Sequence, residues 1–180
     1  MIFYLIISLF IFSASNLGAE TDLQSTLNLS AKDPEKAGEQ GLERLKKFHQ
    51  ETGDRSVRKK ICQTLSGFKN SSISEKAYSA AESIVQYEKE SDVNLVCVNS
   101  LLHLSSDRNK SCRILVHELK KLAGKKDIQN EDEILLQRII EVIGQQKFKG
   151  AYVSLMKILE SGYSVQSKNS AKKVIESLPI

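Results

Sequence analysis

The sequence predicts an all-α protein, and three observations support that fold class. Pro34 and Pro179 are the two prolines of the chain, so proline interrupts no helix between them. Apolar residues recur at steps of three and four rather than in alternation, which is the periodicity of an amphipathic helix and not of a strand. A length of 180 residues, 41% of them hydrophobic, is enough for one domain with a substantial core.

Eight segments carry this helical periodicity. Asp33 followed by Pro34 is a typical start for the first segment, because aspartate caps a helix and proline suits its first turn. Gly38 and Gly41 lie inside that segment and weaken its N-terminal half as a helix. In chain order, the apolar residues that define the eight segments are Leu42, Leu45 and Phe48; Val57, Ile61, Leu65 and Phe68; Ala77, Ala81, Ile84 and Val85; Leu95, Val98, Leu101 and Leu102; Leu115, Leu119 and Leu122; Leu135, Ile139, Val142 and Ile143; Tyr152, Leu155, Met156 and Leu159; Ala171, Val174, Ile175 and Leu178.

The even-numbered segments repeat at an interval near forty residues. Ile61, Val98, Ile139 and Ile175 occupy the same position in successive copies and are separated by 37, 41 and 36 residues. Two helices per unit and a period of this size are typical of helical hairpins stacked in a solenoid. A tetratricopeptide unit of about 34 residues is shorter than these steps. A compact, non-repeating helix bundle is the alternative architecture.

The stretch DRSVRKKICQTLSGF, residues 54–68, resembles the second helix of a HEAT repeat. It contains Asp54, then the pair Val57 and Arg58, then apolar residues at the spacing of that repeat. The other copies keep the pattern less well, and the resemblance covers roughly residues 33–178. It implies an α-solenoid of about four HEAT-like hairpins, in which Asp54 and Arg58 make turn and inter-repeat contacts.

The N-terminus is predicted to be an export signal. Residues 1–12 are apolar apart from Ser8, and a short polar stretch then leads to small residues that suit cleavage after Ala19. Twelve residues at helical rise reach about 18 Å, short of the roughly 30 Å core of a bilayer. The predicted organisation is a signal peptide at 1–19, a flexible leader at 20–32 and a HEAT-like repeat domain at 33–180. The mature chain is expected in the periplasm or outside the cell, with no transmembrane span.

Three cysteines, Cys62, Cys97 and Cys112, follow the export signal. An odd number without a Cys-x-x-Cys spacing is not a disulfide framework, so at least one thiol stays free or pairs between chains. We expect three small buried residues on helices. The sequence leaves open whether any two of them form a disulfide.

The most site-like cluster is the series Cys97-x5-His103-x8-Cys112-x4-His117. These are zinc-type ligands, but steps of six and five residues turn about 240° and 140° on a helix, so neither cysteine–histidine pair shares a face. The apolar neighbours of Cys97 would raise the pKa of its thiol and weaken it as a nucleophile. The sequence also lacks a phosphate-binding glycine loop, a Gly-x-Ser-x-Gly elbow and a His-Glu-x-x-His helix. We expect no catalytic residue, no metal, no cofactor and no enzymatic activity.

Basic and aromatic residues are the remaining candidates for function. The net charge of +4 is modest, and a weakly basic face suits an acidic partner. Two tyrosines late in the first helices of their hairpins are expected to be exposed anchors. The candidate partner-binding residues are Arg55, Lys59, Lys60, Tyr87, Tyr163, Lys172 and Lys173.

A stack of repeats offers a rigid, extended surface, and such surfaces generally serve protein recognition. We therefore expect an exported interaction scaffold whose protein partner is unknown, an acidic protein being one candidate. The alternative is a nucleic-acid-binding or DNA-glycosylase-like HEAT protein. That alternative requires Arg58, Lys59, Lys172 and Lys173 to converge on one basic concave face. Export makes nucleic acid the less favoured partner.

Overall fold

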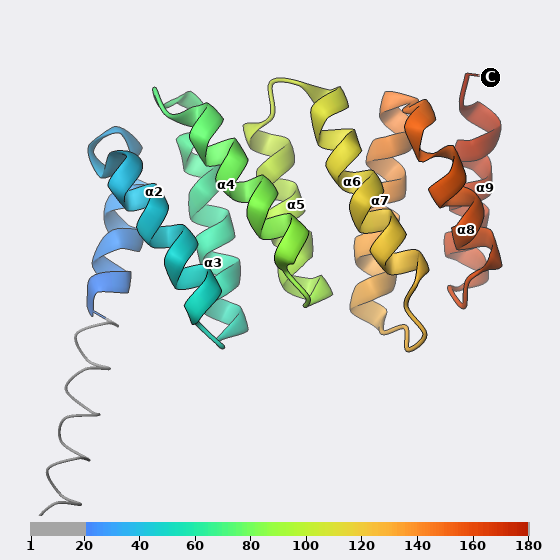
Figure 1. Ribbon diagram of the computed structural model, residues 1–180, viewed down its shortest axis with the longest axis horizontal. Coiled ribbons are helices and arrows are strands. Elements are labelled where there is room, and N and C mark those ends of the chain that lie inside the picture. Colours follow the sequence, from blue (N-terminus) through green and yellow to red (C-terminus); the bar gives the residue numbers. More distant parts are fainter. Residues whose placement is uncertain (1–20, 180) are drawn as a thin grey trace, which may run out of the picture.

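A computed structural model describes residues 21–179 of the chain. Within this range every regular element is helical, which confirms the prediction of an all-α fold (Figure 1). None of these helices combines the length and the apolar character that a membrane span requires. The predicted signal peptide, residues 1–19, lies outside the described residues.

Each of the eight predicted segments corresponds to an α-helix. Two short 3-10 turns, η1 (Gly67–Asn70) and η2 (Lys149–Ala151), extend or precede helices of the series. The helices are α2 (Pro34–Glu51), α3 (Arg55–Ser66), α4 (Ser74–Tyr87), α5 (Ser91–Leu104), α6 (Arg108–Ala123), α7 (Asn130–Gln146), α8 (Tyr152–Glu160) and α9 (Val165–Ser177).

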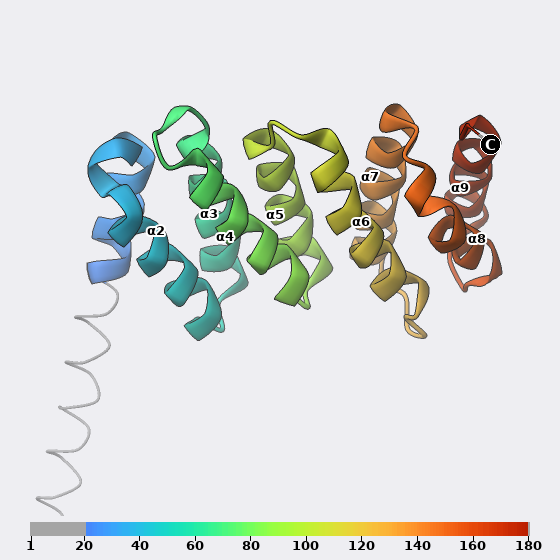
Figure 2. The same cartoon turned by 45° about the horizontal axis from the view of Figure 1, so that its top comes forward.

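Successive helices pair into four hairpins, α2/α3, α4/α5, α6/α7 and α8/α9. The hairpins stand side by side in an elongated row, as both views show (Figures 1 and 2). Helices α3, α5, α7 and α9 contact one another in sequence, and so do α2, α4, α6 and α8. The molecule therefore has two layers of helices, and each hairpin packs mainly on its immediate neighbours.

The core lies between these two layers. It is built mostly from the apolar positions that the helical periodicity picks out, because those positions face inward once per turn. Tyr152 and Met156 are the exceptions, since both are exposed on α8. The largest fully buried side chains are Phe68, Leu45, Ile61, Leu65, Leu101, Leu115, Leu119, Leu135, Leu136, Ile139, Ile140 and Ile143.

The predicted flexible leader at 20–32 is wrong for the residues that the structure describes. Residues 21–32 are helical, and Leu27 in this segment is only 3% exposed. Leu23 and Leu27 are four residues apart, so a helix places both on one face, where they pack against the core. The segment also approaches α2 closely, because a side chain at Gly41 would come within 3.2 Å of the Ser30 hydroxyl. Residues 21–32 thus form an amphipathic helix that was not predicted from the sequence.

Helix α2 begins and bends where the sequence suggested. The Asp33 carboxylate accepts a hydrogen bond from the Lys36 N–H, with Pro34 in the first turn. Gly38 has a φ of 55° and a ψ of −159°, which is not helical and divides α2 by a kink. Glycine suits this position because a residue with a Cβ is strained at such a φ.

Lys147, at the end of α7, has a left-handed conformation with a φ of 48° and a ψ of 42°. A left-handed residue ends many helices, but for a non-glycine residue it costs about 1–2 kcal/mol. We expect Lys147→Gly to raise the free energy of unfolding by about 0.5–1 kcal/mol in urea titrations, since part of the gain is lost to backbone entropy. Lys147→Ala keeps the strain and is the control. A glycine variant less stable than the alanine variant would contradict this prediction.

Candidate functional site

One edge of the molecule carries buried polar contacts between neighbouring hairpins. This edge contains the turns inside the hairpins, which lie along the bottom of Figure 1. A side chain from one hairpin meets a partner in the next at every junction of the row. These edge contacts are Arg58 with Glu88, Asn94 with Glu118, Ser91 with Asp132, and Tyr163 with the Leu122 carbonyl. Because buried polar groups must be paired, the contacts fix how the hairpins align.

Glu88, which follows the last residue of α4, is the centre of the first junction. Its Oε1 accepts hydrogen bonds from the backbone N–H groups of Lys89 and Glu90, both at 2.9 Å. Its Oε2 accepts from the Nε of Arg58 at 2.9 Å. The same arginine donates to the carbonyls of Thr52 and Gly53, each at 3.2 Å. Arg58 therefore joins the turn of the first hairpin to the second hairpin, as the HEAT resemblance implied.

Asp54 serves the turn, as that resemblance also implied. Its carboxylate accepts hydrogen bonds from the N–H groups of Ser56 and Val57 and so caps α3. The hydrogen bonds from Ser56 lower the pKa of Asp54, because they stabilise the ionised form. The cap orients the first turn of α3, from which Arg58 reaches Glu88.

His49 completes the buried group around Glu88. It lies in the last turn of α2 and is 7% exposed. Its Nε2 lies 3.2 Å from the Oε2 of Glu88, within ion-pair range, but without the alignment of a hydrogen bond. A buried ring nitrogen without a hydrogen-bond partner is uncommon in a folded protein.

The charge balance at this junction favours an ionised Glu88. Burial opposes ionisation, but His49, the backbone N–H of Glu90 and the Arg58 guanidinium outweigh it and lower the pKa of Glu88 to about 2. The carboxylate is therefore charged at neutral pH, although it is almost fully buried.

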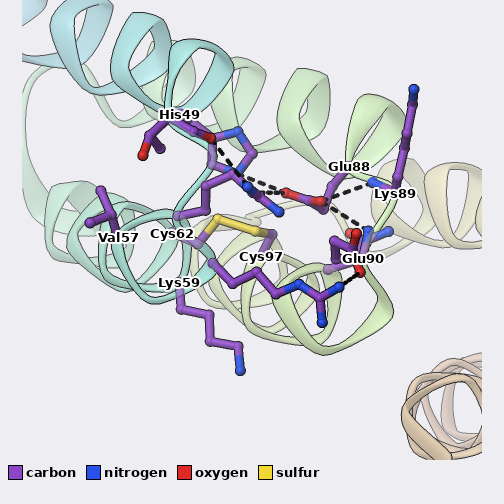
Figure 3. Close-up of polar contacts among 12 residues, drawn as sticks. His49, Val57, Lys59, Cys62, Glu88, Lys89, Glu90 and Cys97 are labelled. Carbon is purple, nitrogen blue, oxygen red and sulfur yellow. Dashed lines mark hydrogen bonds and ion pairs between the residues drawn. A yellow bond between two sulfur atoms is a disulfide. The ribbon is translucent and has the colours of Figure 1, made fainter.

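A disulfide between Cys62 and Cys97 lies beside this group (Figure 3). It joins α3 of the first hairpin to α5 of the second, and both cysteines are fully buried. All three cysteines are buried on helices, as expected, and the disulfide joins the two whose pairing the sequence left open. Cys112 is free and buried, as an odd count required, and burial raises the pKa of its thiol.

His49, Cys62 and Cys97 form the metal-ligand cluster of the described residues, with their ligand atoms all within 4.8 Å of one another. The structure does not gather the predicted zinc-type series of Cys97, His103, Cys112 and His117 into such a cluster. Sequence spacing missed His49 because it lies on a different helix from either cysteine. Figure 3 shows its ring directed toward the disulfide and Glu88.

An open cleft of about 340 Å³ lies over this buried group. Polar side chains, with Ile84, line it between the C-terminal ends of α2 and α4. Its lining residues are His49, Gln50, Thr52, Arg58, Ser83, Ile84, Tyr87, Glu88, Lys89 and Glu90. Tyr87 is 76% exposed at this cleft, in agreement with its predicted exposure.

The other junctions hold further buried carboxylates. Glu118 is 1% exposed, and its burial raises the pKa of its carboxyl although Lys121 lies 2.9 Å away. Asp132 is also buried, but the Gln129 N–H and Lys125 overcome its burial and lower its pKa. The two acids thus shift in opposite directions, because burial dominates at Glu118, whereas Asp132 receives a backbone hydrogen bond in addition to a cation.

Most of the basic candidates of the first repeat are paired with acids. Arg55 lies 2.6 Å from Glu90, and Lys59 lies 2.7 Å from Asp92. Lys60 is exposed on α3 and makes no ion pair among the described residues. The first repeat is therefore a mixed-charge surface rather than a basic one.

The remaining candidates do not join this group. Lys172 and Lys173 are exposed on α9, at the other end of the row from α3 (Figure 1). The expected exposure of Tyr163 is wrong, since this residue is 3% exposed and its hydroxyl donates to the Leu122 carbonyl at 3.3 Å. Tyr163 lies in the turn between α8 and α9, where its ring turns inward against α6, and burial raises the pKa of its hydroxyl.

No family model, curated protein or solved structure matches the chain. The HEAT resemblance therefore rests on the sequence pattern and on the stacked hairpins described above.

Proposed function

We propose that this chain is an exported, non-enzymatic HEAT-like repeat protein that serves as a scaffold for protein–protein interaction. The observation that carries the proposal is Tyr87, an aromatic side chain 76% exposed at the rim of a charged cleft. Tyrosine and arginine are enriched among the residues that dominate binding energy at protein interfaces. The row of hairpins supports Tyr87 on a rigid framework, which lowers the entropy lost on binding.

The disulfide supports the export part of the proposal. Disulfides persist in oxidising compartments such as the periplasm and the extracellular space, and they are rare in the cytosol. The bond between Cys62 and Cys97 ties the two hairpins that form the cleft. An oxidising destination therefore agrees with the apolar N-terminal stretch and with a binding surface that is covalently braced.

The distribution of charge favours a protein partner over nucleic acid. A nucleic-acid surface needs several unpaired cations along one face, because its affinity comes largely from phosphate neutralisation. Here Arg58 is paired with Glu88, and Lys59 is paired with Asp92. Exposed cations such as Lys89 stand beside Glu90, so the cleft suits a polar protein segment of mixed charge.

Crosslinking at position 87 tests this proposal. A photoreactive phenylalanine derivative replaces Tyr87 in the full chain, and the exported fraction is irradiated and its adducts identified by mass spectrometry. The expected result is a discrete protein adduct. We further expect Tyr87→Ala to weaken binding of the identified protein at least tenfold, the loss typical of an interface anchor.

Tyr152 provides the matched control. It is a half-exposed tyrosine on α8, away from the cleft, so Tyr152→Ala should leave the dissociation constant within about twofold. Adducts that consist of nucleic acid, or equal effects of the two alanine variants, would overturn the proposal.

A further inference from the structure

Four polar side chains from four helices converge beneath the cleft. His49 comes from α2, Cys62 from α3, Glu88 from the end of α4 and Cys97 from α5. All four are at least nine-tenths buried, and Figure 3 shows them grouped around the sulfur–sulfur bond. They link the first two hairpins to each other. Among the described residues, His49, Cys62 and Cys97 are the one group of side chains placed to hold a metal.

These side chains are the donor types that zinc prefers. Structural zinc sites combine cysteine thiolates and histidine nitrogen, and carboxylate oxygen also serves as a ligand. Zinc bonds of about 2.0–2.3 Å in a tetrahedron place neighbouring donor atoms roughly 3.3–3.8 Å apart. The Nε2 of His49 and the Oε2 of Glu88 are 3.2 Å apart, and the histidine and cysteine donors lie within 4.8 Å of one another. The histidine and cysteine donors are thus within reach of one metal ion, and Glu88, which lies outside that 4.8 Å group, would have to move toward the sulfurs to complete a tetrahedron.

The surroundings complete the requirements of a metal site. The Nε2 of His49 is buried and has no hydrogen-bond partner, so a metal bound to it would replace no hydrogen bond, only its 3.2 Å approach to the Oε2 of Glu88. The other oxygen of Glu88 is held by the N–H groups of Lys89 and Glu90, which orient the carboxylate. Two thiolates, one carboxylate and a neutral histidine around Zn²⁺ carry one net negative charge, which the Arg58 guanidinium balances.

We propose that reduction of the Cys62–Cys97 disulfide creates a zinc site formed by His49, Cys62, Glu88 and Cys97. The sulfur–sulfur bond breaks as a dithiol gives up two electrons and two protons, becomes a disulfide itself and leaves two thiols on the chain. Zn²⁺ then displaces both protons and forms two zinc–sulfur bonds. The oxidised chain holds its first two hairpins together by a covalent bond, and the reduced chain holds them by the metal. This inference is independent of the partner-binding function proposed above.

Metal titration of the full chain tests the proposal. The protein is reduced with a phosphine, which takes oxygen from water as it is oxidised, and is then desalted under argon. Co²⁺ is added as a spectroscopic probe. The expected result is one cobalt per chain, with thiolate-to-cobalt charge-transfer absorption and the visible bands of tetrahedral coordination, all removed by Zn²⁺. The oxidised chain should show none of these bands.

Variants assign the ligands. Cys62→Ser and Cys97→Ser should each abolish the charge-transfer pattern of the paired thiolates, and His49→Gln should weaken cobalt binding by at least about tenfold. Cys112→Ser removes the free thiol that lies outside the cluster and should bind cobalt as the natural chain does. His103→Gln, an exposed histidine, is a second control.

Circular dichroism distinguishes a missing site from an unfolded chain. Native helicity in the reduced chain without cobalt binding would overturn the proposal, as would binding that survives Cys62→Ser together with Cys97→Ser. Helicity that is lost on reduction and not restored by Zn²⁺ would overturn it too. Restoration of helicity by stoichiometric Zn²⁺ would support it, because the metal would then supply folding free energy at this site.

Discussion

Reduction of the disulfide between Cys62 and Cys97 is expected to lower the free energy of unfolding by about 4 kcal/mol in the absence of added metal. The two cysteines are separated by 35 residues, and closing a loop of that length removes about this much conformational freedom from the unfolded chain. The loss is a large fraction of the 5–15 kcal/mol that stabilises a typical domain. The disulfide would therefore be one of the two largest contributions to stability that we can assign to a single pair of residues.

Urea unfolding with and without a phosphine reductant measures this contribution. The matched control is Cys62→Ala combined with Cys97→Ala, whose stability should not respond to the reductant. The reduced natural chain and this double variant should unfold at similar urea concentrations, apart from the lost packing of the two sulfurs. A natural chain that loses less than about 1 kcal/mol on reduction would contradict the prediction.

Glu88→Gln is expected to destabilise the protein by about 3–5 kcal/mol at neutral pH, because it leaves the largely buried Arg58, which is 12% exposed, without its counter-charge. The effect should depend on pH. The folded-state pKa of about 2 is below the ordinary value of 4.5, so the folded chain binds fewer protons and the stabilisation is complete above pH 4.5. It is lost as the pH falls from 4.5 toward 2, which corresponds to about 3 kcal/mol. The free energies of unfolding of the natural chain and the variant should therefore become similar as the pH approaches 2.

Glu118→Gln is the control of opposite sign. Burial raises the pKa of Glu118, so its protonated form is the favoured one in the folded chain. The free energy of unfolding of the natural chain should rise as the pH falls from the folded-state pKa of Glu118 to its ordinary value. The Glu118→Gln variant lacks this titration, so the natural chain should gain stability relative to the variant over that range. Urea unfolding at a series of pH values measures both effects. If the stability differences of the Glu88 and Glu118 variants changed with pH in the same direction, the opposite pKa shifts assigned to the two groups would be contradicted.

The helices could be predicted from the sequence because their signal is local. Apolar spacing within about fifteen residues identifies a buried face, and all eight predicted segments became α-helices. The helix at 21–32 was not predicted, although the four-residue spacing of Leu23 and Leu27 is a helical signal. Tyr163 was misplaced because it lies in a turn, where helical periodicity does not assign a face.

The buried site could be predicted only in part, because it depends on contacts between hairpins. Asp54 and Arg58 carried a recognisable pattern, and both serve the contacts that it implied. The repeat alignment contained a signal for the disulfide. Ile61 and Val98 are equivalent positions of two successive copies, and Cys62 and Cys97 are their immediate neighbours in the sequence. His49 had no such signal. Its approach to the cysteines is set by the packing of α2 on α3, which a single sequence does not reveal.

If the chain is exported as proposed, the disulfide also imposes an order of events on it. Once the sulfurs of Cys62 and Cys97 are joined, the segment between them is a closed ring. Such a ring cannot move through a narrow channel as a single extended strand. A chain that crosses a membrane unfolded must therefore complete its passage with both thiols reduced and acquire the bond on the far side. Premature oxidation would strand it in the compartment of its synthesis.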